Sequence, residues 1–169
     1  MDQTAPLLPS EVESEISMAR EWRIQRLGRA ALVALIAGAL AGLLGPGPLS
    51  WSDATTADGT LEVEYSRFAR QGADIALRLR TSAAAAAGDE QVSVVLGRDL
   101  LDVLEVRQVS PEPEAQRSTS EGVTMDFAVA EGAALEVTVA VTVEAMGWHR
   151  GSIGLAGQPP LRLGQFFYP

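Results

Sequence analysis

Few side chains in this sequence have the chemistry of a catalytic group. His149 is the only histidine and cysteine is absent, which excludes thiol chemistry and histidine-rich metal sites. The serines that could complete a Ser–His–Asp arrangement are Ser110, Ser118 and Ser120, and none lies in a Gly-x-Ser-x-Gly elbow. His149 lies between Trp148 and Arg150, just before Gly151, and this expected turn chemistry favours a solvent-exposed turn histidine over a general base. We expect no catalytic residue and no enzyme.

The carboxylates are numerous but poorly spaced for binding a metal ion. Asp53 to Gly59 lacks the alternating ligands of a calcium loop, and Asp89-Glu90 and Asp99 with Asp102 are too sparse. No glycine-rich loop is present to cradle a phosphate. Aromatic residues are 5% of the chain, too few to suggest a sugar cleft between paired carboxylates. We therefore expect no metal ion and no cofactor. The acids are expected to be solvated side chains or turn and cap residues.

An uncharged, mostly apolar stretch from Ala30 to Ser52 is the strongest structural signal in the chain. The arginines before it are Arg20, Arg23, Arg26 and Arg29, whereas the charges that closely follow it are all acidic. This asymmetry predicts a single-pass transmembrane helix with a cytoplasmic N-terminus. The expected organisation is a cytoplasmic tail and juxtamembrane helix over 1–29, the transmembrane helix and its outer interface over 30–52, and an extracytoplasmic domain over 53–169.

The apolar core of this stretch is short. Ala30 to Leu44 rises only about 22 Å, against about 30 Å of hydrocarbon. Leu27 and Trp51 are therefore expected to reach the inner and outer interfaces. Ala39-Leu40-Ala41 would also serve as a signal-peptide cleavage site, so cleavage after Ala41 is the alternative. The long leader, with its many acids, favours an uncleaved anchor.

A helix is expected to begin before the membrane. Ser10 and Glu13 match a capping box, so the helix should open at Ser10 and continue into the bilayer. Its apolar residues do not form one stripe, which favours a solvated helix over the alternative of a cytoplasmic protein contact.

Small residues recur at every fourth position of the predicted membrane helix. Ala34, Gly38 and Gly42 share one face, where they would let another helix approach closely. The pattern predicts self-association or contact with a multi-pass membrane protein. Because alanine and glycine make up eight of the 15 residues from Ala30 to Leu44, a plain anchor is the alternative.

Beyond a polar linker at 45–59, the apolar period changes from helical to alternating. The predicted strands are 61–66, 75–80, 92–96, 104–109, 123–129, 135–143, 148–155 and 161–167. Seven or eight short strands without long helical patterns predict an antiparallel immunoglobulin-like β-sandwich. Leu135 to Val143 alternates most cleanly, so its leucine and valines should face the core.

Opposite charges on the first two of these strands are expected to pair. Glu62 and Glu64 should face Arg78 and Arg80 if the strands are antiparallel. A helical turn is expected within 99–104, a loop at 83–87 and a stiff connection at 111–114.

The expected extracytoplasmic domain is acidic. From Asp53 onward there are 17 acids against nine arginines, a net charge of −8. Such a domain is not expected to seek nucleic acid or anionic lipid head groups. All 13 basic residues of the chain are arginine, which is typical of GC-rich bacterial genomes.

Three segments carry a resemblance to a known group of proteins. They are Gly45-Pro46-Gly47-Pro48-Leu49-Ser50, Leu61-Glu62-Val63-Glu64-Tyr65-Ser66-Arg67-Phe68 and Gln165-Phe166-Phe167-Tyr168-Pro169. The pattern resembles small bacterial single-pass membrane proteins of unknown function with an extracytoplasmic β-sandwich domain. The resemblance implies a multi-pass membrane protein as partner.

The expected function is therefore a membrane-anchored extracytoplasmic interaction module, an accessory subunit of a bacterial envelope membrane complex. A periplasmic binding domain for a small ligand or cell-wall component is the alternative, and an envelope hydrolase comes third.

Overall fold

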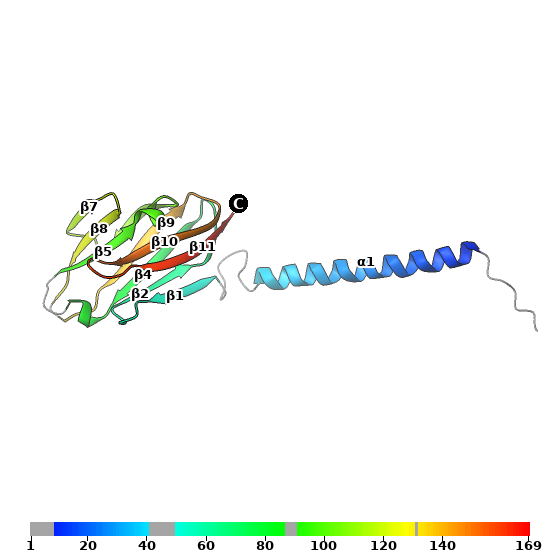
Figure 1. The fold of residues 1–169 in the computed structure, drawn as a ribbon, viewed down its shortest axis with the longest axis horizontal. Coiled ribbons are helices and arrows are strands. Elements are labelled where there is room, and N and C mark those ends of the chain that lie inside the picture. Colours follow the sequence, from blue (N-terminus) through cyan, green and yellow to red (C-terminus); the bar gives the residue numbers. More distant parts are fainter. Residues whose placement is uncertain (1–8, 41–49, 87–90, 131) are drawn as a thin grey trace, which may run out of the picture. The chain divides into compact units, whose positions relative to one another are not determined.

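The computed structural model describes residues 9–40, 50–86, 91–130 and 132–169. The chain divides into two compact units, Met1–Leu40 and Ala41–Pro169. The first contains one long helix, α1 (Pro9–Leu40), which begins one residue before the expected start at Ser10 (Figure 1). The large apolar side chains that α1 leaves exposed are Trp22, Ile24, Leu27, Leu32, Val33, Leu35, Ile36 and Leu40.

No helix in the described part of the chain is both long and apolar enough to qualify as a membrane span. The span expected over 30–52 includes residues 41–49, which lie outside the described residues. The transmembrane helix therefore stays a prediction.

The second unit is a β-sandwich of two sheets, with 11 strands in the described residues (Figure 1). In spatial order the five-stranded sheet contains β1 (Trp51–Thr55), β2 (Leu61–Ser66), β4 (Asp74–Thr81), β9 (Glu136–Val143) and β6 (Leu104–Ser110). The six-stranded sheet contains β3 (Phe68–Arg70), β11 (Leu161–Tyr168), β10 (Gly147–Leu155), β5 (Gln91–Gly97), β8 (Gly122–Ala128) and β7 (Ala115–Ser118). A mainly β sandwich after an N-terminal helix is confirmed.

The expected number of strands, seven or eight, is wrong because three short strands show no alternation of apolar and polar residues from which they could be predicted. β1 lies inside the predicted linker at 45–59, and its residues are exposed or only partly buried. β3 is three residues long and follows β2 after Arg67 alone. β7 is an edge strand with every residue exposed, so it has no apolar alternation to detect.

The core lies between the sheets and is filled by alternate residues of the strands. Val137, Val139, Val141 and Val143 are each at most 1% exposed, as their alternation predicted, and Leu135 is buried with them. All buried core residues lie between 61 and 167, so the sandwich has a core of its own.

The expected charge pairing between β2 and β4 is confirmed. The register places Glu62 opposite Arg80 and Glu64 opposite Arg78. Arg78 Nη1 lies 3.6 Å from Glu64 Oε2, whereas the guanidinium of Arg80 lies 3.5 Å from Glu136 on β9. These exposed pairs help to set register and contribute little to stability.

Two short helices join strands. α2 (Arg98–Leu101) forms the expected helical turn one residue earlier than predicted. The predicted loop at 83–87 contains instead a 3-10 turn, η1 (Ala83–Ala86). Its four successive alanines have no side chain that competes for backbone hydrogen bonds.

The chain crosses from one sheet to the other between β2 and β3. β2 ends at Ser66, Arg67 bridges the sheets, and Phe68 begins β3, which pairs in parallel with the last strand, β11. The backbone of Arg67 is held on both sides, because its N–H donates to Ser50 O (2.6 Å) and its carbonyl accepts from Phe166 N–H (2.7 Å). This crossing shapes the surfaces described next.

Candidate functional site

His149 is not the exposed turn residue that the sequence suggested. It lies within β10, partly buried, and its ring stacks on Phe167 with centroids 5.8 Å apart. Its Nε2 lies 2.8 Å from Met146 O. Turn signals around position 149 misled the prediction because Gly151 belongs to the strand, where the absence of a side chain makes room for Leu100.

A serine and an aspartate do meet, but without a histidine. The Ser152 hydroxyl donates to Asp99 Oδ1 at 2.7 Å, and the backbone amides of Ser152 and Leu100 donate to the same oxygen. This carboxylate ties α2 to β10. The contact is a structural one.

The acids considered as metal ligands also do not gather into one site. Among the described residues no three His, Asp or Glu side chains come together as a metal site. Hydrogen bonds from the Thr56 and Thr60 hydroxyls and from the Thr60 amide lower the pKa of Asp58 below its usual value. Asp58 therefore stabilises the β1–β2 turn. Asp89 and Glu90 lie outside the described residues.

The predicted membrane-helix residues are described only in part. Ala34 and Gly38 lie four residues apart in α1, whereas Gly42 lies outside the described residues. Of the four arginines, the side chain of Arg20 is not described. The guanidinium of Arg26 lies 5.2 Å from the ring centroid of Trp22, one turn earlier in the helix.

The sandwich has a groove of about 600 Å³, which we call the β4 groove. Trp51, opposite Ser66 on the β1–β2 ribbon, lines one part, and Ala76, opposite Ala140 on β4 and β9, lines another. Phe68 on β3 lines it too. The groove exists because the β1–β2 ribbon separates from β4 where the chain crosses between sheets.

The β4 groove borders an open strand edge. Backbone groups of alternate residues in a strand point to opposite neighbours. Ser82 N–H donates to Thr60 O, so the even-numbered residues of β4 point toward β2. Pairing with β2 ends at Glu64, and Asp74 and Ala76 lie beyond it. Their N–H and C=O groups are therefore directed into the groove, where no described strand pairs with this edge.

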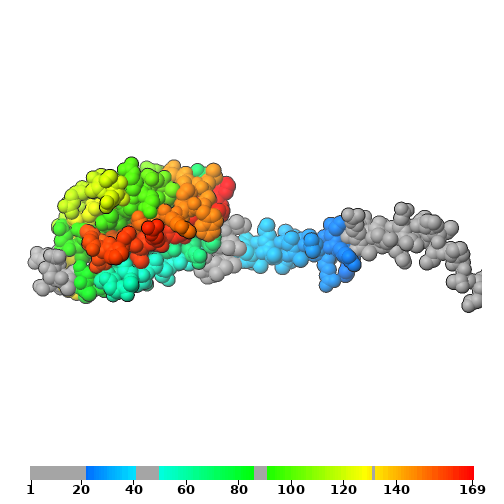
Figure 2. All heavy atoms as spheres, viewed as in Figure 1, coloured from blue at the N-terminus to red at the C-terminus, as the bar shows by residue number. Residues whose placement is uncertain are grey.

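A second surface lies on the outer side of the six-stranded sheet. We call it the aromatic–arginine face, and its residues are Phe68, Arg70, Trp148, Arg150, Arg162 and Phe166. Trp148 on β10 is opposite Phe166 on β11, which is opposite Phe68 on β3, so three rings form a row across three strands. The Trp148 and Phe166 ring centroids are 5.3 Å apart. Figure 2 shows β10 and β11, in orange and red, crossing this side of the sandwich.

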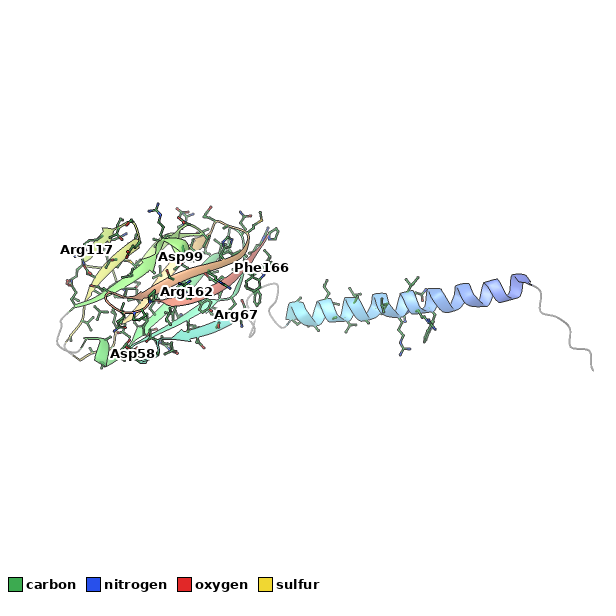
Figure 3. All side chains as sticks on the ribbon, viewed as in Figure 1. Asp58, Arg67, Asp99, Arg117, Arg162 and Phe166 are labelled. Atoms are coloured by element: carbon green, nitrogen blue, oxygen red, sulfur yellow. The ribbon has the colours of Figure 1, made fainter. Side chains whose placement is uncertain are left out.

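Sequence reasoning missed both surfaces. The even positions of β11, including Arg162 and Phe166, alternate with its buried residues, so an outward aromatic and an outward arginine were detectable (Figure 3). That they join Trp148 and Phe68 depends on strand order, which the alternation does not contain.

In comparisons with known proteins, no family model matches this chain, and no curated protein matches it either.

Proposed function

We propose that this protein is a membrane-anchored extracytoplasmic interaction module, an accessory subunit of a bacterial envelope membrane complex. The anchor in the inner or plasma membrane begins at residue 30 and ends before β1, which starts at Trp51, and the N-terminus is cytoplasmic. Support comes from the apolar side chains that α1 leaves exposed, such as Leu32, Leu35 and Leu40, and from Arg23, Arg26 and Arg29 before them. The self-contained core of the sandwich fits a domain that folds independently of the anchor.

The sandwich belongs, in this proposal, to the immunoglobulin-like type. β3 crosses to the second sheet and pairs in parallel with the final strand, while β2 stays antiparallel to β4. A sandwich of this kind presents sheet faces and edges for binding rather than an enclosed catalytic cleft.

The β4 groove is the observation that carries the proposal. An extended segment of a multi-pass membrane protein would pair with the open edge at Asp74 and Ala76, and its side chains would fill the space beside Trp51 and Phe68. Backbone pairing supplies affinity and the apolar walls supply selectivity, so no catalytic group and no cofactor is needed.

Photo-cross-linking in intact cells tests this function. A benzophenone amino acid in place of Ala76 should react with a multi-pass membrane protein, and mass spectrometry should place the adduct in an extracytoplasmic segment of it. The matched control is the same probe at Ala115, an exposed residue of β7 on the other sheet.

A groove-filling variant makes the test independent of the probe. Ala140→Trp occupies the groove from the outer side of β9, where residue 140 is only partly buried, and should abolish the adduct while the sandwich melts as the wild type does. Equal adduct yields at Ala76 and Ala115, or an undiminished yield in Ala140→Trp, would contradict the proposal.

The size of the same groove favours one second function, a binding domain for a small ligand or cell-wall component. About 600 Å³ is within the range of small-molecule sites. In that case the Ala76 probe should label no protein, and Ala140→Trp should abolish the thermal stabilisation that cell-wall fragments give the wild type.

A further inference from the structure

We infer that the aromatic–arginine face binds the surface of an anionic lipid bilayer. The net charge of the sandwich by itself predicts no such affinity, since acids outnumber arginines. The fold, however, brings three of the nine arginines of the sandwich, Arg70, Arg150 and Arg162, to one face. The face therefore has to be considered by its own residues rather than by the domain average.

The aromatic row has the composition of a membrane-interface contact. Trp148 is 69% exposed, the most exposed large apolar side chain described in the sandwich, and it contacts the half-buried ring of Phe166. An indole with one apolar body and one N–H donor is favoured at the level of the lipid head groups. Exposing these apolar rings to water alone is unfavourable, so the row suits a surface that covers it.

The charged side chains on the three strands that carry the row are arginines, and Asp99, the acid that reaches this side, is bound by the hydroxyl and amide of Ser152, opposite Arg162. β3, β10 and β11 contain no aspartate or glutamate, and their charged residues other than His149 are Arg70, Arg150 and Arg162. All three arginines are exposed, and none forms a salt bridge within the described residues. In a domain with almost twice as many acids as arginines, unpaired guanidinium groups on one face suit phosphate groups of a surface.

The position of the row favours a bilayer over a soluble anion or a protein. Ser50 Oγ donates to Phe68 O at 2.9 Å, so the row lies at the end of the sandwich where the chain enters. Nine residues, 41–49, separate this end from the last described residue of α1. From Leu40 to Ser50 the chain can reach at most about 36 Å. With the proposed anchor, the row is thus held within reach of the head groups.

This step uses the anchor of the proposed function, but the lipid contact can be measured without it. Every buried core residue lies within 61–167, so a fragment of residues 50–169 retains the whole core. It contains only two tryptophans, Trp51 and Trp148. The probes are vesicles of phosphatidylglycerol and phosphatidylcholine in equal parts, and vesicles of phosphatidylcholine alone. Binding is measured by co-sedimentation and by the shift of tryptophan emission.

The wild-type fragment should bind the anionic vesicles, and its tryptophan emission should shift to the blue. It should dissociate in 1 M salt, where the Debye length is only about 3 Å. Arg150→Ala with Arg162→Ala should weaken binding by about 25-fold, since each arginine near an anionic surface contributes about fivefold. Trp148→Ser should weaken binding and remove most of the shift. Arg107→Ala, an exposed arginine of the other sheet, is the matched control and should bind as the wild type does.

Each variant is compared only after its melting curve matches that of the wild type. Absence of wild-type binding to anionic vesicles, or full binding by the double arginine variant, would overturn the inference. A benzophenone at position 148 that reacts in cells with protein and not with lipid would assign the face to a protein instead. The Ala76 probe reports on the β4 groove separately, so failure there leaves the vesicle result standing.

Discussion

The side-chain amide of Gln165 donates to the carbonyl oxygen of Ser66 at 2.9 Å, and both residues are buried. Ser66 is the last residue of β2, beyond the end of its pairing with β4, so its carbonyl has lost the partner that the sheet would have supplied. The amide of β11 replaces that partner from the opposite sheet. One side chain thereby satisfies the backbone at the crossing that also creates the β4 groove.

Gln165→Leu should destabilise the sandwich by about 1–3 kcal/mol, because the variant leaves the buried Ser66 carbonyl without its donor. Chemical denaturation of the 50–169 fragment measures the change. Gln116→Leu, at an exposed position of β7, is the control and should change stability by less than about 0.5 kcal/mol. Equal effects at the two positions would remove the assigned role from Gln165.

Val139→Asp should unfold the sandwich, since it places an unpaired charge in the core at a fully buried position of β9. The expected loss, about 4–5 kcal/mol or more, approaches the whole stability of a small domain. Thr138→Asp should be tolerated, because residue 138 is on the outer side and opposite Arg78. Circular dichroism of both variants checks this, and a folded Val139→Asp would contradict the assigned faces.

Arg117→Ala should cost about 1–3 kcal/mol, because it removes a charged partner from a buried carboxylate. Arg117 Nη2 lies 2.8 Å from Asp126 Oδ2, and Asp126 is otherwise bonded to the Ser93 hydroxyl at 2.6 Å. Arg80→Ala breaks a pair with Glu136 that is exposed on both sides, and should cost at most about 1 kcal/mol. The free energy of unfolding should therefore fall more in Arg117→Ala than in the control variant.

The proposed topology predicts the location of both chain ends. A reporter that is active only outside the cytoplasm should be active when it is fused after Pro169, and a cytoplasmic reporter at the same point should be silent. The reverse pattern would contradict the orientation proposed from Arg20, Arg23, Arg26 and Arg29. A mature N-terminus at Gly42 would show that the leader is cleaved.

Gly38→Leu should weaken association of the anchor in the membrane, because a large side chain keeps the two helix backbones apart. Gly42→Leu should act in the same way if residue 42 continues the same face. Ile36→Val, two residues from Gly38 and so on the opposite side of α1, is the control. Co-purification of differently tagged copies, and of the membrane partner, measures the effect. Unchanged co-purification in both glycine variants would mean that the helix is only an anchor and that its small residues make no helix contact.

The sequence by itself determined which residues of the longer strands face the core. In β9 and β11 the inward side chains repeat every second residue, and this period is a local property of an extended backbone. The cross-strand pairing of Glu64 with Arg78 was predictable for the same reason, because both strands show their charged faces in the sequence. The short strands β1, β3 and β7 were missed, since they bury too little side chain to leave a pattern.

Only the tertiary structure decided which strands are neighbours, and both proposed surfaces depend on that choice. Phe68, Trp148 and Phe166 form one row because β3, β10 and β11 lie side by side, although about 80 residues separate the first from the second. The β4 groove exists because β2 stops pairing with β4 after Glu64 and the chain then crosses to the other sheet as β3. Strand order is set by the packing of distant segments around a common core, and that energy is absent from any local stretch of sequence.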